Sequence, residues 1–157
     1  MGTHVRRLAV ITRLCAAVAA TTLSGCAQTG STKEVVFTSG APASIGPYSQ
    51  GIRHGNMLFL AGQGAIDPKT NQPMTSASIE DQTKQALENL RAVLEANGMT
   101  LGNIVSTTVY MKDLNEFARM NAVYGTYFID KPPARATLEA ARLPRDLKVE
   151  ISAIAVK

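Results

Sequence analysis

In the segment from residue 132 to residue 144, PPARATLEAARLP, an arginine stands two residues after a pair of prolines, within a strand-like run. Proline restricts the backbone, so Pro132 and Pro133 would hold Arg135 in a fixed direction at the start of that strand. A guanidinium offers a planar fork of donors that matches a carboxylate. Arg135 therefore either binds the carboxylate of a ligand or pairs with a nearby acidic side chain, and the segment alone favours neither.

Glu150 is the acidic residue that could complement Arg135 in a site. It lies in the last predicted strand, between Val149 and Ile151. Side chains alternate along a strand, so Glu150 points away from its two apolar neighbours. The strand pattern by itself favours a solvated carboxylate paired with a base on a neighbouring strand. The functional alternative is a carboxylate that positions or activates a water molecule.

Two further polar side chains could face a ligand. Asn121 interrupts the apolar stripe of a predicted helix, where a buried amide needs hydrogen-bond partners. A core amide bonded to the backbone is the simpler interpretation of that pattern. Tyr48 follows Pro47 in the turn IGPYSQG, which fixes the direction of its ring. The simpler interpretation of Tyr48 is a packed ring with its hydroxyl in water.

The sequence lacks the residues that a metal site, a Ser-His-Asp triad or a dinucleotide-binding loop would need. One histidine, His54, follows the first 25 residues, and a predicted hairpin turn leaves it exposed. That is too few for a set of convergent metal ligands or for a Ser-His-Asp arrangement. The segment AGQG, residues 61–64, leads into turn residues rather than into a helix, unlike a dinucleotide-binding loop. We therefore expect neither a metal ion nor a cofactor.

The first 25 residues have the composition of an export signal. A basic start, with Arg6 and Arg7, precedes an apolar stretch that is too short to span a bilayer. The stretch ends in LSGC, which is similar to a bacterial lipobox with Cys26 as the lipidated residue. We expect a signal peptide over 1–25, a lipid-anchored tether over 26–33 and a folded domain over 34–157. The anchored protein would face the periplasm from the outer membrane if the host has one.

The charge of the chain gives no reason to expect nucleic-acid binding. The 157 residues contain 16 Lys and Arg against 12 Asp and Glu. Three of those bases, Arg6, Arg7 and Arg13, lie in the predicted signal, which leaves 13 bases against the same 12 acids and a net charge of +1. A nearly neutral surface without a basic cluster favours other partners.

The domain alternates between strand and helix patterns. Strands are predicted over 34–39, 103–113, 134–143 and 147–157, with a hairpin over 51–66 that turns at Gly55. Helices are predicted over 78–98, capped by Ser78 and Asp81, and over 113–128, capped by Asp113. The segments 57–66 and 149–156 are apolar or small on both faces. A sheet covered on one side by two helices needs a second cover, and another copy of the chain would supply it.

These segments together resemble the RidA/YjgF family of enamine and imine deaminases. The resemblance rests on IGPYSQG, GNMLFLAGQ, DPKTNQ, TTVYMKDLNEF, MNAVYGTYF, PPARATLEAARLP and VEISAIAV, which follow one another without large gaps over 34–157. It implies a chorismate-mutase-like α+β fold, in which two helices cover a mixed sheet. It also implies a homotrimer with clefts between subunits.

The family hydrolyses reactive 2-imino acids to 2-oxo acids and ammonia. The resemblance implies that Arg135 holds the substrate carboxylate and that Glu150 serves the hydrolytic water. Four other positions match residues of the family's cleft: Tyr48, Asn121, Gly62 and Thr137. Ala61 departs from the pattern, because many deaminases have a serine there. A non-catalytic envelope trimer that binds small carboxylates, or acts like a chaperone, is the alternative function.

Overall fold

The computed structural model describes residues 32–157, which contain six strands and two α-helices. The strands are β1 (Lys33–Val36), β2 (Gly51–His54), β3 (Met57–Gly64), β4 (Ile104–Met111), β5 (Ala134–Glu139) and β6 (Val149–Val156). The helices are α1 (Ile79–Glu95) and α2 (Phe117–Tyr127). Short 3-10 turns cover Leu101–Asn103, Leu114–Glu116 and Pro144–Asp146.

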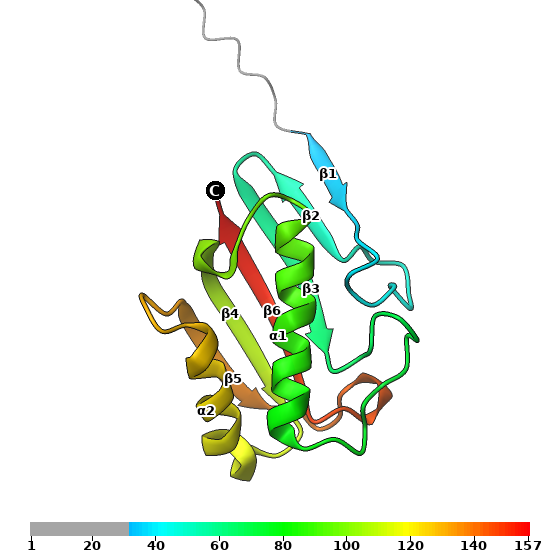
Figure 1. Cartoon of the computed structure of the whole chain (residues 1–157), viewed down its shortest axis with the longest axis vertical. Helices are drawn as coiled ribbons and strands as arrows, with labels where there is room; N and C mark the ends of the chain where they lie inside the picture. The colour runs from blue at the N-terminus through cyan, green and yellow to red at the C-terminus, as the bar shows by residue number, and fades with distance from the viewer. Residues whose placement is uncertain (1–31) are drawn as a thin grey trace, which may run out of the picture. The chain divides into compact units, whose positions relative to one another are not determined.

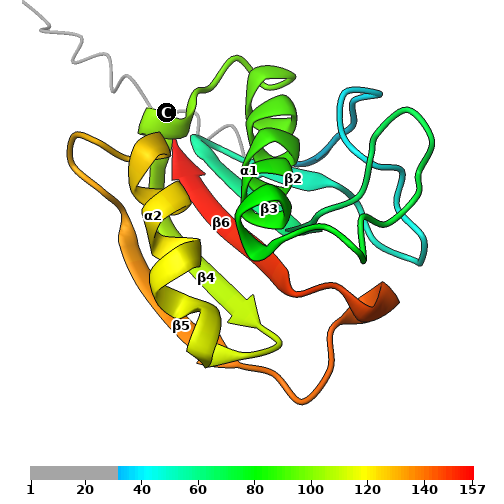
Figure 2. The same ribbon diagram turned by 60° about the horizontal axis from the view of Figure 1, so that its bottom comes forward.

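All six strands form one mixed sheet in the order β1-β2-β3-β6-β4-β5. The pairs are antiparallel except for β4 and β5, which are parallel. Parallel neighbours need a crossover connection, and α2 supplies it between β4 and β5. Helix α1 likewise connects β3 to β4, which lie on either side of β6. Both helices pack on the same face of the sheet (Figures 1 and 2), which confirms the predicted α+β architecture.

Helix α1 forms where the sequence predicts it. The side chain of Ser78 accepts a hydrogen bond from the backbone N–H of Asp81, which caps the first turn. The helix is followed by Gly98, whose positive φ of 65° suits glycine at a helix end. Seven residues at helical spacing form one buried stripe that faces the sheet: Ile79, Thr83, Ala86, Leu87, Leu90, Val93 and Leu94.

Helix α2 begins later than predicted. Asp113 caps the 3-10 turn Leu114–Glu116, and the α-helix starts only at Phe117. The apolar stripe of a helix that began at Asp113 would include Leu114 and Phe117, but the buried stripe is shorter. Met120 and Tyr124 are buried in the helix, and Phe128 is buried just after it. Leu114 is exposed, since it precedes the α-helix and lies in the tighter turn.

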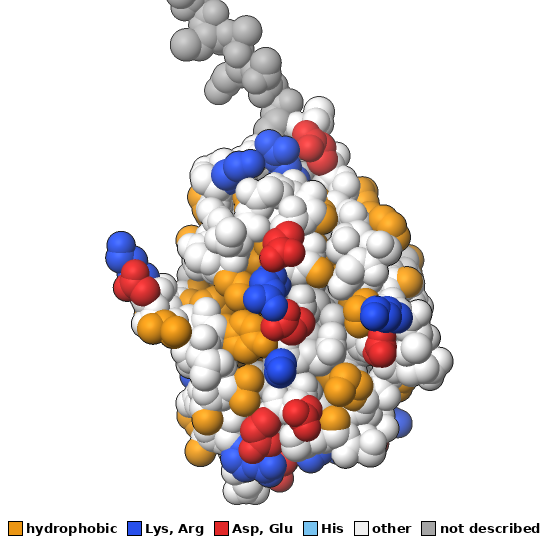
Figure 3. Space-filling view, in the orientation of Figure 1, with side chains coloured by type: hydrophobic (Ala, Val, Ile, Leu, Met, Phe, Trp, Pro, Cys, Tyr) orange, Lys and Arg blue, Asp and Glu red, His pale blue; other side chains and the backbone are white. Residues whose placement is uncertain are grey.

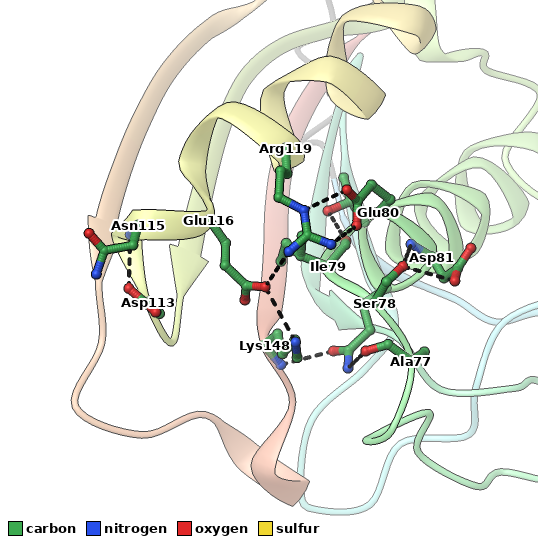
Figure 4. Close-up of polar contacts among 12 residues, drawn as sticks. Ala77, Ser78, Ile79, Glu80, Asp81, Asp113, Asn115, Glu116, Arg119 and Lys148 are labelled. Carbon is green, nitrogen blue, oxygen red and sulfur yellow. Dashed lines mark hydrogen bonds and ion pairs between the residues drawn. The ribbon is translucent and has the colours of Figure 1, made fainter.

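Five polar side chains tie the two helices to the start of β6 (Figure 4). The Arg119 guanidinium donates to both carboxylate oxygens of Glu80 at 2.7 Å and to Glu116 at 3.1 Å. Glu116 also lies 3.3 Å from the ammonium of Lys148. The backbone N–H of Lys148 in turn donates to Gln82 of α1 at 2.8 Å. This network fixes the entry of β6, the strand that carries Glu150.

The helix-bearing face and the opposite face of the sheet differ in character. Basic and acidic side chains are interspersed over the helix-bearing face, with apolar patches between them (Figure 3). On the opposite face, a row in register across the sheet contains Val35, Ile52, Phe59, Ile154, Ser106 and Ala134. Val35 is 66% exposed and Phe59 is 41% exposed, so this row, which is apolar except for Ser106, is uncovered in the single chain. A covering copy of the chain remains a prediction.

The predicted signal segment, Cys26 and the tether as far as residue 31 lie outside the described residues. Within residues 32–157, no helix combines the length and the apolar character that crossing a membrane requires.

Candidate functional site

Five of the six predicted cleft residues fall into two separate hollows. The first, here called the Glu150 pocket, is a cavity of about 320 Å³ that contains Tyr48, Gly62 and Glu150. Its other lining residues are Ile45, Ala61, Gly64, Ile66, Pro144, Arg145 and Leu147. The second, here called the Arg135 groove, has a volume of about 400 Å³ and contains Asn121 and Arg135. Its remaining lining residues are Tyr124, Gly125, Phe128, Pro132 and Pro133.

Glu150 lies in its pocket without a cationic partner among residues 32–157. The carboxylate is half-buried, and this burial raises the pKa of Glu150 above that of an ordinary glutamate. The predicted pairing with a base across the sheet is therefore wrong. A carboxylate that is partly desolvated and not ion-paired is suited to accept and return a proton. In the same described range, no three His, Cys, Asp or Glu side chains come together as candidate metal ligands.

Gly62 lets the end of β3 approach Glu150. A Cβ atom at this position would overlap the Glu150 carboxylate, so only glycine leaves both groups in place. The register between β3 and β6 shifts between Leu60 and Gln63, and this irregularity brings Gly62 to the carboxylate. Ala61 lies beside Gly62 in the pocket wall and contributes a methyl group where a serine would contribute a hydroxyl.

The loop that carries Tyr48 is organised by a residue that the sequence analysis missed. Gln50 is 2% exposed, and its side chain accepts from the N–H of Thr38 at 2.7 Å. Its amide nitrogen donates to the carbonyls of Thr38, Ala41 and Pro42 at 2.8–3.2 Å. One buried amide thereby closes the loop from 38 to 50. A glutamine directly before a strand in a turn-rich segment was the available signal.

The opposite wall of the Glu150 pocket is also held by side chains. Arg145 and Asp146 both have positive φ angles, 56° and 58°, which are strained for residues other than glycine. Arg145 donates to the carbonyl of Asn71 at 2.6 Å, and Asp146 pairs with Lys112 at 2.7 Å. Asp is one of the residues that tolerate the left-handed region, but Arg is not, so the positive φ of Arg145 was not predictable from its residue type.

Arg135 does not pair with an acid in the described part of the chain. Its guanidinium carbon lies 4.5 Å from the ring centre of Tyr124 and 5.7 Å from that of Phe117. The ion-pair alternative for Arg135 is therefore wrong for the single chain. Asn121 is only partly buried and lines the same groove, so the core-amide interpretation is also wrong. Its side chain and that of Arg135 face one hollow.

Thr137 follows Arg135 by two residues and lies on the same face of β5. Its hydroxyl oxygen is buried and has no hydrogen-bond partner among residues 32–157. Thr137 does not line the Arg135 groove in the single chain. Its predicted contact with a substrate therefore stays a prediction.

The two hollows lie on opposite faces of the sheet. Arg135 pairs with Thr107 on β4, whose side chain contacts α2, so Arg135 is on the helix-bearing face. Glu150 pairs with Tyr110 on β4 and alternates with buried Val149, so it is on the uncovered face. Three residues and two strand spacings separate the two backbones, or about 14 Å. A single chain cannot bring both side chains to one small ligand.

Comparison with known proteins places this arrangement in a family. A family model described as endoribonuclease L-PSP matches residues 38–157. A RutC family protein of Pyrococcus horikoshii is 54% identical over 125 residues, which span 80% of this chain and 98% of that protein. A protein of Escherichia coli named 2-iminobutanoate/2-iminopropanoate deaminase is 46% identical over 127 residues, spanning 79% of this chain and 98% of that protein.

Solved structures agree with the sequence match. The crystal structure of the YjgF gene product from E. coli superposes with a TM-score of 0.75 at 46% identity, covering 79% of this chain and 98% of that one. The structure of E. coli TdcF with bound serine has a TM-score of 0.75 at 41% identity, with the same coverage. With sequence and fold in agreement over the described domain, this chain belongs to the endoribonuclease L-PSP family, the RidA/YjgF family that its sequence segments resemble.

Proposed function

We propose that this protein hydrolyses reactive 2-imino acids to 2-oxo acids and ammonia, in sites shared between neighbouring copies of the chain in a trimer. The observation that carries the proposal is the separation of two complementary half-sites. Arg135, a cation without an acidic partner in the described chain, lies on one face, and the desolvated carboxylate of Glu150 lies on the other. Packing the Arg135 groove of one copy against the Glu150 pocket of another would complete the site.

The chemistry needs orientation and one placed water molecule. Arg135 would bind the substrate carboxylate and thereby hold the imine carbon near Glu150. Glu150, as the carboxylate, would take a proton from water while the oxygen adds to the carbon of the C=N bond. Passing that proton to the nitrogen would complete a carbinolamine with one hydroxyl and one amino group. Glu150 would then move the hydroxyl proton to the amino nitrogen as the C=O bond forms and the C–N bond breaks, so that ammonia leaves and the 2-oxo acid remains. The raised pKa of Glu150 favours both acceptance and return of the proton.

Two named relatives support this choice of substrate. The E. coli protein that is 46% identical is named for 2-iminobutanoate and 2-iminopropanoate, which are small 2-imino acids. TdcF was crystallised with serine, which carries the same carboxylate next to a nitrogen-bearing carbon. The present chain has Arg135 and Glu150 at the positions that the family resemblance assigns to substrate binding and to the hydrolytic water, while Ala61 makes the pocket wall less polar.

The test generates an imine beside the purified protein. An amino-acid oxidase produces the 2-imino acid, and semicarbazide traps whatever is not hydrolysed. We expect the protein to lower the yield of trapped imine in proportion to its concentration, and Arg135→Ala to abolish most of this effect. If trapping is unchanged while the protein still binds 2-oxo acids, deaminase activity is wrong and a non-catalytic carboxylate-binding trimer takes its place.

A further inference from the structure

The Arg135 guanidinium is held in its groove by aromatic rings. The ring of Tyr124 is the closer of the two, with its centre 4.5 Å from the guanidinium carbon. A cation is attracted to the face of an aromatic ring, and this contact uses none of the guanidinium N–H groups. An acidic partner would instead occupy those donors and would compete with a ligand carboxylate. The aromatic support therefore leaves the donors of Arg135 available.

The supporting ring is itself fixed. The Tyr124 hydroxyl lies 2.8 Å from the hydroxyl oxygen of Thr107, and the two residues are 5% and 2% exposed. The Phe128 ring packs beside the Tyr124 ring with centres 4.6 Å apart. Thr107 is also the residue of β4 that pairs with Arg135 on β5. Thr107 on β4 therefore fixes the Tyr124 ring directly, and its strand also pairs with β5, which carries Arg135.

We propose that Tyr124, locked by Thr107, is a positioning residue that sets the direction of the Arg135 guanidinium and keeps its donors free for a ligand carboxylate. The identity of that ligand as a 2-imino or 2-oxo acid rests on the proposed function. Tyr124 acts through Arg135, because its own hydroxyl is engaged with Thr107. Thr107 acts one step further away, by holding the ring in place.

A purely structural role of Tyr124 predicts something different. A core residue that only stabilises the fold would affect all ligands of the groove alike. A positioning role predicts a loss that depends on the ligand's carboxylate and on the presence of Arg135. The two roles can be separated by comparing 2-oxobutanoate with its uncharged amide, and by repeating the substitution in a chain without Arg135.

The experiment measures dissociation constants of 2-oxobutanoate and its amide by calorimetry on the full chain. We expect Tyr124→Leu to weaken binding of the acid by about fivefold, the upper end for loss of a cation–π contact made by an exposed guanidinium, and to leave binding of the amide unchanged. Tyr124→Phe and Thr107→Val keep the ring but remove its hydrogen bond to the other residue, and each should weaken binding of the acid by about two- to threefold. Tyr127→Phe is the matched control, because Tyr127 lies on the same helix and donates to Glu88, away from Arg135.

The double variant decides the outcome. In the Arg135→Ala background, Tyr124→Leu should cause no further loss of acid binding, since the residue it positions is absent. Equal weakening of acid and amide, or full additivity with Arg135→Ala, would overturn the proposal. So would unchanged acid binding in Tyr124→Phe, Thr107→Val and Tyr124→Leu while Arg135→Ala abolishes it. If Arg135→Ala alone leaves acid binding unchanged, Arg135 does not bind the ligand carboxylate as the proposed function requires, and the positioning role of Tyr124 is wrong as well.

Discussion

At the scale of single residues, Arg135 is the first position to test. A charged hydrogen bond contributes about 1.5–3 kcal/mol, and a bidentate pair lies at or above the top of that range. Arg135→Ala should therefore lower kcat/KM for imine hydrolysis by about ten- to a hundredfold or more. Arg135→Lys should recover little, because an ammonium cannot reproduce the planar fork. Steady-state hydrolysis measures both.

Arg142→Ala provides the control for this series. Arg142 is an exposed arginine of the same segment and lies outside both hollows. It should keep full activity, and all three variants should keep the assembly state of the wild type in light scattering. Wild-type hydrolysis by Arg135→Ala would contradict the assignment.

The ionised Glu150 carboxylate should make the folded chain less stable at neutral pH, because burial disfavours its charge. Burial raises its pKa, so the folded chain binds this proton more readily than the unfolded chain does. Stability contributed by this group is full below the ordinary glutamate pKa and is lost as pH rises through the raised value. Glu150→Gln removes the ionisation, so it should raise Tm at pH 7 and change it little at acidic pH. Thermal unfolding at both pH values measures this, and a lower Tm at pH 7 would contradict it.

The same group sets the pH dependence of turnover. Glu150 must be ionised to accept a proton, so kcat/KM should fall as the pH drops through the pKa of Glu150. Because burial raises that pKa, the fall should begin at a higher pH than for an ordinary glutamate. Glu150→Gln should retain binding of 2-oxobutanoate and lose most of kcat. A Gln variant with wild-type turnover would mean that another group serves the water.

At the scale of elements, the irregular end of β3 determines where Glu150 lies. Gly62→Ala would place a methyl group against the Glu150 carboxylate and should displace it, lowering kcat with little change in Tm. Gly64→Ala would instead meet the buried Leu147 side chain and should destabilise the fold by about 1–3 kcal/mol. Gly102→Ala, with only an ordinary contact to Thr100, should change neither property. Kinetics and thermal unfolding of the three variants separate these cases.

The elements themselves were largely predictable from the sequence. The hairpin at Gly55 and helix α1 follow from local signals: turn residues, a cap and an apolar stripe. The start of α2 was misplaced, because Asp113 can cap a 3-10 turn as well as an α-helix. The buried-amide interpretation of Asn121 failed for a related reason, since the groove beside α2 leaves that position partly exposed.

The site was only partly predictable. Residue types and the family resemblance singled out Arg135, Glu150, Tyr48, Asn121 and Gly62, and the structure groups them into two hollows. That the hollows lie on opposite faces depends on strand register, which a sequence does not display. Tyr124 contacts Arg135 across 11 residues, and Gln50 contacts its loop across 8–12 residues, so no local pattern displays these contacts, although the position of Gln50 directly before a strand was a signal for the loop.

At the scale of the whole molecule, the N-terminal segment predicts attachment to a membrane by lipid. The lipobox-like LSGC makes Cys26 the expected acceptor of the lipid. Cys26→Ser should block lipid incorporation and leave an uncleaved or mislocalised precursor. Metabolic labelling with palmitate, followed by fractionation of the envelope, tests this. Equal labelling of the wild type and the Cys26→Ser protein would contradict the anchor.

The uncovered face of the sheet bears on assembly. Exposed apolar residues such as Val35 and Phe59 form a continuous row there, and water contact with such a row is unfavourable. A trimer would cover this face and would also bring Arg135 of one copy to Glu150 of the next. In the proposed trimer, one contact between subunits would thus both bury the apolar face of the sheet and complete the site for imine hydrolysis.

The most direct test of this shared site mixes two inactive variants. Arg135→Ala subunits retain Glu150, and Glu150→Gln subunits retain Arg135, so a mixed trimer contains one junction with both wild-type residues. Unfolding and refolding the two variants together in equal amounts should restore about a quarter of the wild-type imine hydrolysis, since about three-quarters of random trimers are mixed and each has one restored site. Each variant refolded alone should stay inactive. If the mixture shows no more activity than the separate variants although mixed trimers form, Arg135 and Glu150 do not act across a subunit boundary, and the account is wrong.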